Sequence, residues 1–240
     1  MNPDMTNLLR NWPHEPGELN VREVKASDGR RLLQVRVVLG ILQFEANGRP
    51  DGEESLLELL NAELEDIRSK GVEPSNFTID ENHAAALREE AALYHHRYVA
   101  LLKLEDYAGV VADTTHNLTI FNLCRDHSVK EHDREVLEQF RAQVIATRAR
   151  AQAAAEVRDG HAKAALLAID LAIADIRSQC IPRDGADPPE VGLLQGMRDV
   201  LVPRLPSSQR HELEQRLKAA LQAENYELAA LLRDEIRMMQ

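Results

Sequence analysis

Cysteine is scarce in this sequence. The chain has only Cys124 and Cys180, which lie far apart, and neither belongs to a C-x-x-C pair. Such isolated thiols exclude a disulfide framework and a paired-cysteine zinc knuckle. They are typical of proteins that work in a reducing compartment.

Long apolar stretches are also missing. No run of about 18 apolar residues occurs, which is roughly the length that a helix needs to cross a bilayer. The segment from Met1 to Glu18 is polar and lacks the charged start and the apolar core of a signal peptide. We therefore expect a cytoplasmic protein that does not associate with membranes.

The sequence has fewer basic than acidic residues. Forty Asp and Glu residues stand against 29 Lys and Arg, which gives a net charge of −11. A field of this sign repels phosphate backbones and anionic lipids. Nucleic acid is therefore not an expected partner unless a local basic patch binds it.

The residue patterns of catalysis are missing as well. The sequence has no P-loop, no serine elbow and no cysteine flanked by histidine and acid in a catalytic arrangement. Its many carboxylates recur at helical spacing, which is typical of solvent-facing sides. We expect a protein without enzymatic activity and without a cofactor.

The N-terminal part contains a pattern of β-structure. Residues Leu19 to Ala46 are rich in β-branched side chains, and Asp28-Gly29 lies where a tight turn would fold this stretch back on itself. The pattern predicts a β-hairpin. Beyond Gly40 the apolar side chains change face, which indicates a bulge or a break. Turn residues at 47–52 then lead to a helix capped by Ser55.

From Asp80 onward the sequence has a helical period. Apolar side chains recur every three or four residues in four stripes, which predict two helical hairpins because the turns at Glu105-Asp106 and Arg158-Gly160 are short. Glycine and prolines between Ile181 and Pro189 predict a linker. The four stripes are Leu87, Ala91, Tyr94, Tyr98 and Leu101; Tyr107, Val111, Thr114, Leu118 and Phe121; Leu137, Phe140, Val144, Thr147 and Ala151; and Ala162, Leu166, Ile169, Ile173 and Ile176.

Together these patterns predict a mainly α protein with a small N-terminal β-hairpin element. We expect a hairpin and helix unit at residues 1–75 and a helical-hairpin body at 80–180. A linker and connecting helix at 181–206 would lead to a terminal helical hairpin at 207–240.

The hairpins of the body resemble tetratricopeptide-type helix pairs, in which an acidic or glycine turn precedes a helix that begins with an aromatic residue and small side chains. Their turns lie about 54 positions apart, against about 34 in a tetratricopeptide array. The resemblance implies the packing of helical hairpins and leaves a true repeat array open.

The segment from Ser208 to Gln240 predicts two helices joined at Glu224-Asn225. The small pair Ala229-Ala230 lets two backbones approach closely. A hairpin of about thirty residues cannot bury its own apolar stripe, so the rest of the chain, a second copy or another protein must complete it. The residues that line this stripe or begin the second helix include Leu213, Leu217, Leu221, Tyr226, Arg233 and Ile236.

The run from Tyr226 to Ile236, which reads Tyr-Glu-Leu-Ala-Ala-Leu-Leu-Arg-Asp-Glu-Ile, resembles the UVR motif. In that family the motif is the helical hairpin through which the excision-nuclease subunits UvrB and UvrC recognise each other, and it recurs in adaptors of Clp-type ATPases. The resemblance implies that the hairpin is packed by Tyr226, Ala229, Ala230 and Leu232, while Arg233 and Asp234 make polar contacts. The rest of the chain resembles uncharacterised bacterial UVR-containing proteins. The alternative is an ordinary surface coiled coil.

The leading hypothesis is a non-catalytic adaptor that docks a protein partner through this hairpin. The partner would belong to the Clp-type or excision-nuclease-type machinery, or would be a second copy of the chain. The paired zinc knuckles of the Clp-linked adaptors and the helicase or nuclease domains of the repair subunits are not in this sequence. The alternative function is a nucleic-acid-associated accessory protein of DNA repair.

Two further groups of residues could bind small ligands. One group consists of Arg30, Arg36 and Arg49, which could form an anion or peptide site because guanidinium groups make paired hydrogen bonds to carboxylates and phosphates. Alternatively, these arginines could simply close turns and face solvent. Cys124 and His127 have the spacing of a metal-ligand pair, but no second closely spaced pair faces them. We expect no metal site.

Overall fold

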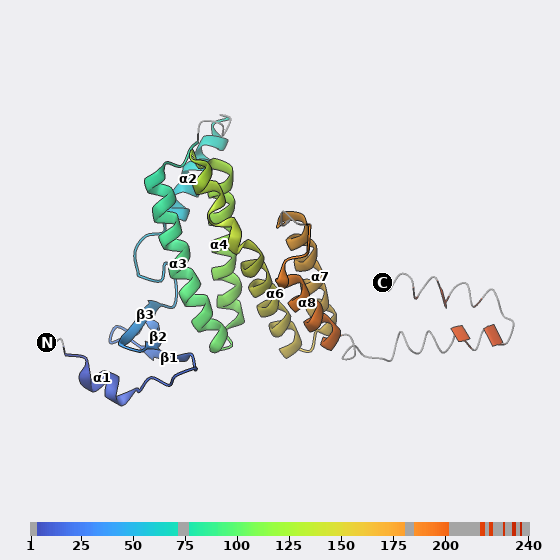
Figure 1. Cartoon of the computed structure of the whole chain (residues 1–240), viewed down its shortest axis with the longest axis horizontal. Coiled ribbons are helices and arrows are strands. Elements are labelled where there is room, and N and C mark those ends of the chain that lie inside the picture. Colours follow the sequence, from blue (N-terminus) through green and yellow to red (C-terminus); the bar gives the residue numbers. More distant parts are fainter. Residues whose placement is uncertain are drawn as a thin grey trace.

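The computed structural model describes residues 4–71, 77–180 and 185–201, together with individual residues between 217 and 236. The described elements run from α1 to α8 along the chain (Figure 1). They are α1 (Thr6–Asn11), β1 (Asn20–Lys25), β2 (Arg31–Val37), β3 (Gly40–Glu45), α2 (Leu56–Ser69), α3 (Glu81–Lys103), α4 (Tyr107–His127), α5 (Glu131–Glu135), the 3-10 turn η2 (Glu138–Phe140), α6 (Arg141–Arg158), α7 (Ala162–Gln179) and α8 (Pro189–Leu201). The predicted class, mainly α with a small N-terminal β element, is confirmed.

The β element is a three-stranded antiparallel sheet with the order β1-β2-β3. Gly29 has a φ of +91° in the turn between β1 and β2, where glycine avoids the strain of a side chain. The register then pairs Val37 with Gly40, so Val38 and Leu39 form a second tight turn. The predicted bulge or break near Gly40 is therefore a reversal of the chain, and the expected returning arm of the hairpin consists of two strands.

The sheet packs against one end of the helical bundle. Leu33, Val35 and Phe44 are buried in one cluster with side chains of α3, α4 and α6, among them Tyr98 and Val110. A second and larger cluster joins α2, α3, α4, α6, α7 and α8. The sheet thus covers the end of a core that the helices build.

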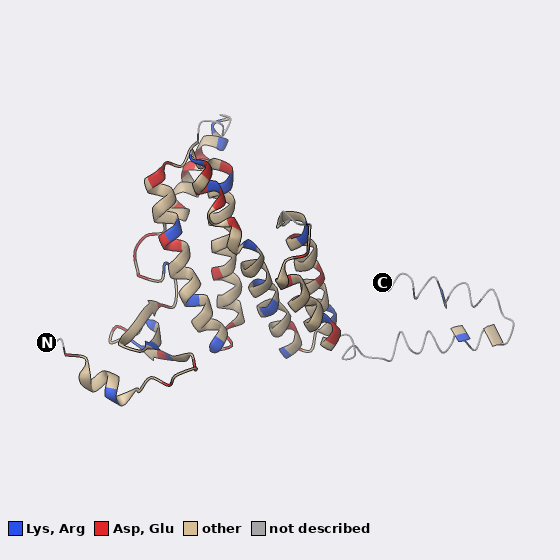
Figure 2. Ribbon diagram, in the orientation of Figure 1, with Lys and Arg blue, Asp and Glu red and all other residues tan. Residues whose placement is uncertain are grey.

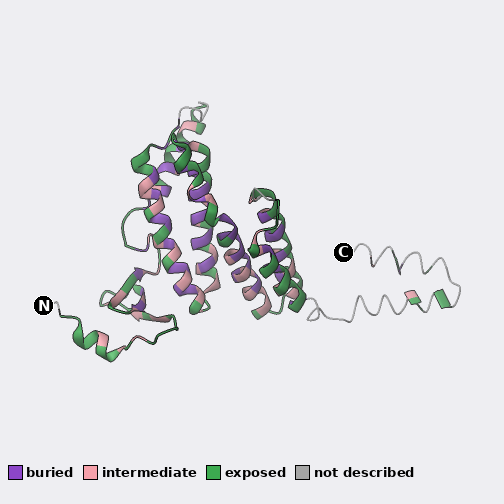
Figure 3. Ribbon diagram, in the orientation of Figure 1, coloured by how far each residue is buried: buried purple, intermediate pink, exposed green. Residues whose placement is uncertain are grey.

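Helices α3 and α4 begin where the sequence predicts. Asp80 and Asp106 cap α3 and α4, since their Oδ1 atoms accept hydrogen bonds from the backbone N–H groups of His83 at 2.8 Å and Gly109 at 3.1 Å. Every member of the predicted stripe on α3 is buried, and buried residues follow α3, α4 and α6 along their lengths (Figure 3). The apolar stripes and the turn at Glu105-Asp106 were therefore sufficient to locate the first helical hairpin, and the two caps are a further finding of the structure.

The third stripe was predicted wrongly at its start. Phe140 is 46% exposed, because the chain between α4 and α6 forms the short helix α5 and a 3-10 turn before α6 begins at Arg141. From Val144 onward α6 follows the predicted period, and it pairs with α7 through a turn at Gly160. Helix α8 packs on α7 and buries Val191 and Leu194 in the core that they share.

Two buried charges connect the parts of this fold. The guanidinium of Arg97 on α3 donates to both carboxylate oxygens of Asp113 on α4, at 2.9 and 2.6 Å, and to the carbonyl oxygens of Glu45 at 2.9 Å and Gly48 at 2.7 Å. The carboxylate of Glu90, also on α3, accepts a hydrogen bond of 2.6 Å from the hydroxyl of Ser55 at the start of α2. These bonds attach the sheet and α2 to the first helical hairpin.

Replacing Arg97 by Met should lower the free energy of unfolding by about 3–5 kcal/mol, because Asp113 would stay buried without its cation. The matched control is Arg31→Met, which removes a largely exposed arginine and should cost less than about 1 kcal/mol. Urea unfolding of both variants measures the difference. Equal stability of the two variants would contradict the role given to Arg97.

The stability of the protein should fall as the pH drops below about 4.5. Burial raises the pKa of Glu90, but hydrogen bonds from His116, Ser55 and the Leu56 backbone N–H outweigh it and hold the pKa below the ordinary value of 4.5. As the pH falls, Glu90 is therefore protonated in the unfolded chain at a higher pH than in the folded protein. The stabilisation is complete above about pH 4.5 and is lost as the pH falls through the pKa of Glu90 in the folded protein.

Glu90→Gln should test this pH dependence. The variant should be less stable by about 1.5–3 kcal/mol at neutral pH, because its hydrogen bonds lose their charge assistance. The difference from the natural protein should shrink by about pH 3.5. Urea unfolding at both pH values gives the comparison, and a constant difference would show that Glu90 is not the titrating group.

Candidate functional site

The described residues of the terminal segment, which include Leu217, Leu221, Leu228, Leu232 and Ile236, are helical. Leu232 is 6% exposed and packs with Leu217 and Ile236. Among the residues that the structure describes, these three form a cluster separate from the two clusters of the body. The terminal segment therefore contains a small apolar contact of its own.

Two leucines of this segment are exposed to solvent. Leu221, which was predicted to bind a partner, is 51% exposed, and Leu228, which was not predicted, is 44% exposed. Arg233 is also exposed. The other predicted binding residues, Leu213, Tyr226, Ala229, Ala230 and Asp234, lie outside the described residues.

The structure does not bring the three predicted anion-binding arginines together. Arg30 forms ion pairs with Asp28 and Glu45, and Arg49 forms one with Asp51. Arg36 is 8% exposed and donates to backbone carbonyl oxygens, including that of Gly40 at 3.0 Å. Arg30 directly precedes β2 and Arg36 lies six residues further along the strand, which is about 20 Å. Each guanidinium thus closes a turn or pairs with a nearby acid.

The histidines and cysteines of the helices make structural contacts. Cys124 is buried, and this burial raises the pKa of its thiol to about 11. His127 lies with its Nδ1 3.3 Å from the Phe77 carbonyl oxygen, and His116 stacks on Tyr94 with 3.7 Å between ring centroids. Within the described parts of the chain, no group of three or more His, Cys, Asp or Glu side chains could hold a metal ion.

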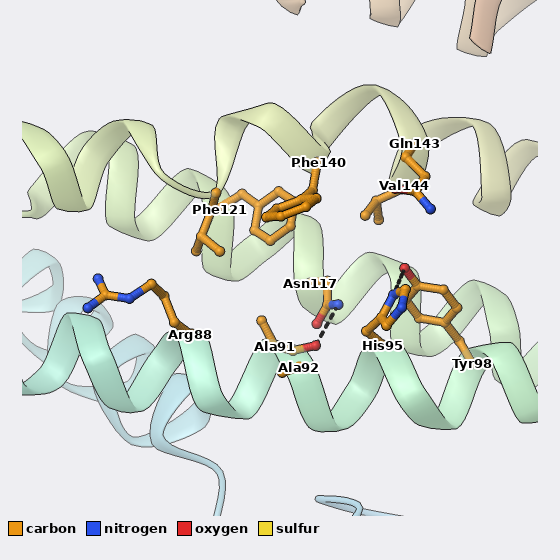
Figure 4. A pocket seen from close by; sticks show the side chains of 11 residues that line it. Arg88, Ala91, Ala92, His95, Tyr98, Asn117, Phe121, Phe140, Gln143 and Val144 are labelled. Carbon is orange, nitrogen blue, oxygen red and sulfur yellow. Dashed lines mark hydrogen bonds between the residues drawn. The ribbon is translucent and has the colours of Figure 1, made fainter. Parts of the chain in front are cut away.

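A cleft of about 310 Å³ opens between α3 and the start of α6 (Figure 4). Helix α3 supplies Arg88 and His95 to this cleft, and α4 supplies Asn117. Phe121 of α4 and Phe140 of η2 line it as well. We call this space the α3–α6 cleft.

Most polar side chains of the α3–α6 cleft form hydrogen bonds with neighbouring groups, with one exception on Asn117. Asn117 is 2% exposed and its Nδ2 donates to the Ala91 carbonyl oxygen at 3.0 Å, whereas its Oδ1 has no hydrogen-bond partner among the described residues. His95 Nδ1 lies 2.6 Å from the hydroxyl of Tyr98. Burial and the neighbouring His96 lower the pKa of His95, and burial raises the pKa of Tyr98 to about 12.

Sequence reasoning missed this cleft. It assigned Tyr98 and Phe121 to the core and Phe140 to a helical stripe. One signal was available: Asn117 lies three residues after Thr114 and four before Phe121, so an amide stands on the apolar face of α4.

The comparison with known families locates the functional segment. Residues 207–240 match the family model of the UvrB/uvrC motif (UVR), which confirms the resemblance found in the sequence. UVR motifs mediate protein–protein interactions, and they are known from UvrB and UvrC and from Clp-type contexts. Neither a curated protein nor a solved structure matches the chain. In the described part of the chain, every helix is too short or too polar to span a membrane.

Leu232→Asp should unfold the terminal segment and leave the body unchanged, because Leu232 packs within a cluster separate from the body's core. Burying a carboxylate in place of this leucine should cost the hairpin several kcal/mol, on the order of 2–5. Circular dichroism should report lost helix, while the main thermal transition stays within about 2 °C of its original temperature.

Leu221→Asp introduces the same charge at a half-exposed position of the segment and is the control for Leu232→Asp. It should retain the helical signal. A large drop in the main transition for Leu232→Asp alone would mean that the terminal segment packs on the body.

Proposed function

We propose that the protein is a non-catalytic cytoplasmic adaptor that docks a partner protein through its UVR motif. The observation that carries the proposal is the family match at residues 207–240, in a segment that exposes Leu221 and Leu228. The partner belongs to the excision-nuclease-type or Clp-type machinery, or is a second copy of this chain. Exposed apolar side chains such as these give docking its affinity in other protein interfaces.

The charges of the sheet argue against the alternative of a nucleic-acid-binding repair accessory. Arg31 is paired with Glu23 at 2.8 Å and with Asp106 at 2.9 Å, and Arg22 donates to the Gln34 side chain. Acidic and basic residues are interspersed over the described helices (Figure 2). A phosphate backbone would therefore have to displace existing carboxylates, and it would approach a protein with a net charge of −11.

The reactive side chains of the described core support a non-catalytic role. The raised pKa of Cys124 keeps its buried thiol protonated, and thiolate is the nucleophilic form. Glu90 and His116 are hydrogen-bonded to each other at 2.8 Å, and Glu90 also holds the start of α2. These groups stabilise the junctions between helices.

A binding experiment on the full chain tests the docking role. The variant Leu221→Asp/Leu228→Asp places charges on the exposed apolar side chains of the UVR segment and should weaken binding to a UvrB-type, UvrC-type or Clp-type protein, or to itself, by at least about tenfold. Tenfold corresponds to about 1.4 kcal/mol, which is a modest loss when two charges are placed in a proposed interface. Calorimetry with each purified candidate, and sedimentation for self-association, measure the change.

Leu167→Asp/Leu171→Asp is the matched control, because these α7 leucines are 59% and 60% exposed and the charge change is the same. Binding should be unaffected in this variant. If the α7 pair abolished binding and the UVR pair did not, docking through the motif would be wrong. Duplex DNA serves as a further probe, since binding that weakens with salt would instead favour the repair accessory.

A further inference from the structure

We propose that the α3–α6 cleft is a binding site for a neutral, planar aromatic group that carries a hydrogen-bond donor, such as an indole. This site lies on the helical body and does not depend on the proposed docking through the UVR motif. Its residues come from α3, α4 and the chain from η2 into α6 (Figure 4).

The requirement for a donor comes from Asn117. Its Nδ2 is committed to the Ala91 carbonyl oxygen, which fixes the orientation of the amide and leaves Oδ1 as the end without a partner. Asn117 is 2% exposed, and a buried acceptor without a partner is costly, so the group that enters the cleft is favoured when it presents an N–H or O–H to this oxygen.

The preference for a flat ring comes from the walls. Phe121 and Phe140 line the cleft across from α3, whose small side chains Ala91 and Ala92 leave room (Figure 4). Phe140 is 46% exposed, so a large aromatic side chain stands at the opening. Aromatic rings pair favourably in stacked and edge-to-face arrangements. A cleft of about 310 Å³ is near the lower limit of ligand pockets and accommodates a bicyclic ring.

The preference for a neutral group comes from the charges around the cleft. Arg88 is paired with Asp133, which neutralises the cation at one end. At the other end His95 contacts the Tyr98 hydroxyl, and its lowered pKa keeps the imidazole uncharged at neutral pH. An ionic ligand would therefore lose its hydration and find no unpaired counter-charge among these groups.

The test compares indole with benzofuran, which has the same shape but an oxygen in place of the N–H. Ligand-observed NMR on the full chain should give a dissociation constant for indole of about 1 mM or tighter, as expected for a ligand of this size. Benzofuran should bind at least about tenfold more weakly because it leaves Asn117 Oδ1 unpaired. Failure of indole to bind, or equal binding of the two rings, overturns the proposal.

Two variants locate the binding. Ala92→Trp fills the cleft from its exposed edge and should abolish indole binding, whereas Ala164→Trp, at an exposed alanine of α7, should leave it unchanged. Asn117→Leu should bring the affinities for indole and benzofuran close together. Unchanged indole binding in Ala92→Trp overturns the proposal even if Asn117→Leu does not fold.

A third ligand distinguishes the two natural sources of such a ring. N-acetyl-tryptophanamide carries the indole between two peptide groups, as it occurs in a protein. Tighter binding than indole, lost in Ala92→Trp, supports capture of a partner's aromatic side chain. Weaker binding than indole supports a free small molecule as the ligand of the same cleft.

Discussion

The buried guanidinium of Arg97 fixes the N-terminal sheet against the first helical hairpin, which consists of α3 and α4. It joins α3 to α4 through Asp113, and it joins both helices to the end of β3 and the following loop through the carbonyl oxygens of Glu45 and Gly48. A guanidinium has donors in a fixed plane, so occupying them on three sides fixes the relative positions of these segments. The apolar contacts of the sheet, such as that of Phe44, then follow from this placement.

The two sides of helix α3 make different contacts. Glu90 and Arg97 are seven residues apart and therefore share one face of α3, where their hydrogen bonds attach it to α2, α4 and the sheet. Arg88 and His95 are also seven residues apart and lie on the opposite side, which borders the α3–α6 cleft. Fixing α3 on its anchored face keeps the cleft open on the other, because the helix cannot move inward to fill it.

Local signals made most of the fold predictable. The caps Asp80 and Asp106, the glycine turn at Gly29 and the apolar periods each depend on a few neighbouring residues. The third strand was missed because its turn consists of Val38 and Leu39, which carry none of the usual turn chemistry. The exposure of Phe140 and the ion pair between Arg30 and Glu45 depend on how distant segments meet, and spacing in the sequence does not contain that information. The ion pairs Arg30–Asp28 and Arg49–Asp51 are local and agree with the alternative that these arginines close turns.

The UVR motif and the α3–α6 cleft also differ in whether the sequence alone could reveal them. The UVR motif was recognisable because its packing residues lie within one segment of the sequence, whereas the α3–α6 cleft is built from three segments that meet only in the fold. Asn117 and Thr114 both place a polar side chain on the apolar face of α4. The hydroxyl of Thr114 donates to the Val110 carbonyl oxygen of its own helix at 2.6 Å and needs no outside partner. An amide has two polar ends, and the structure pairs the Nδ2 end of Asn117 with the Ala91 carbonyl oxygen but leaves its Oδ1 without a hydrogen-bond partner among the described residues.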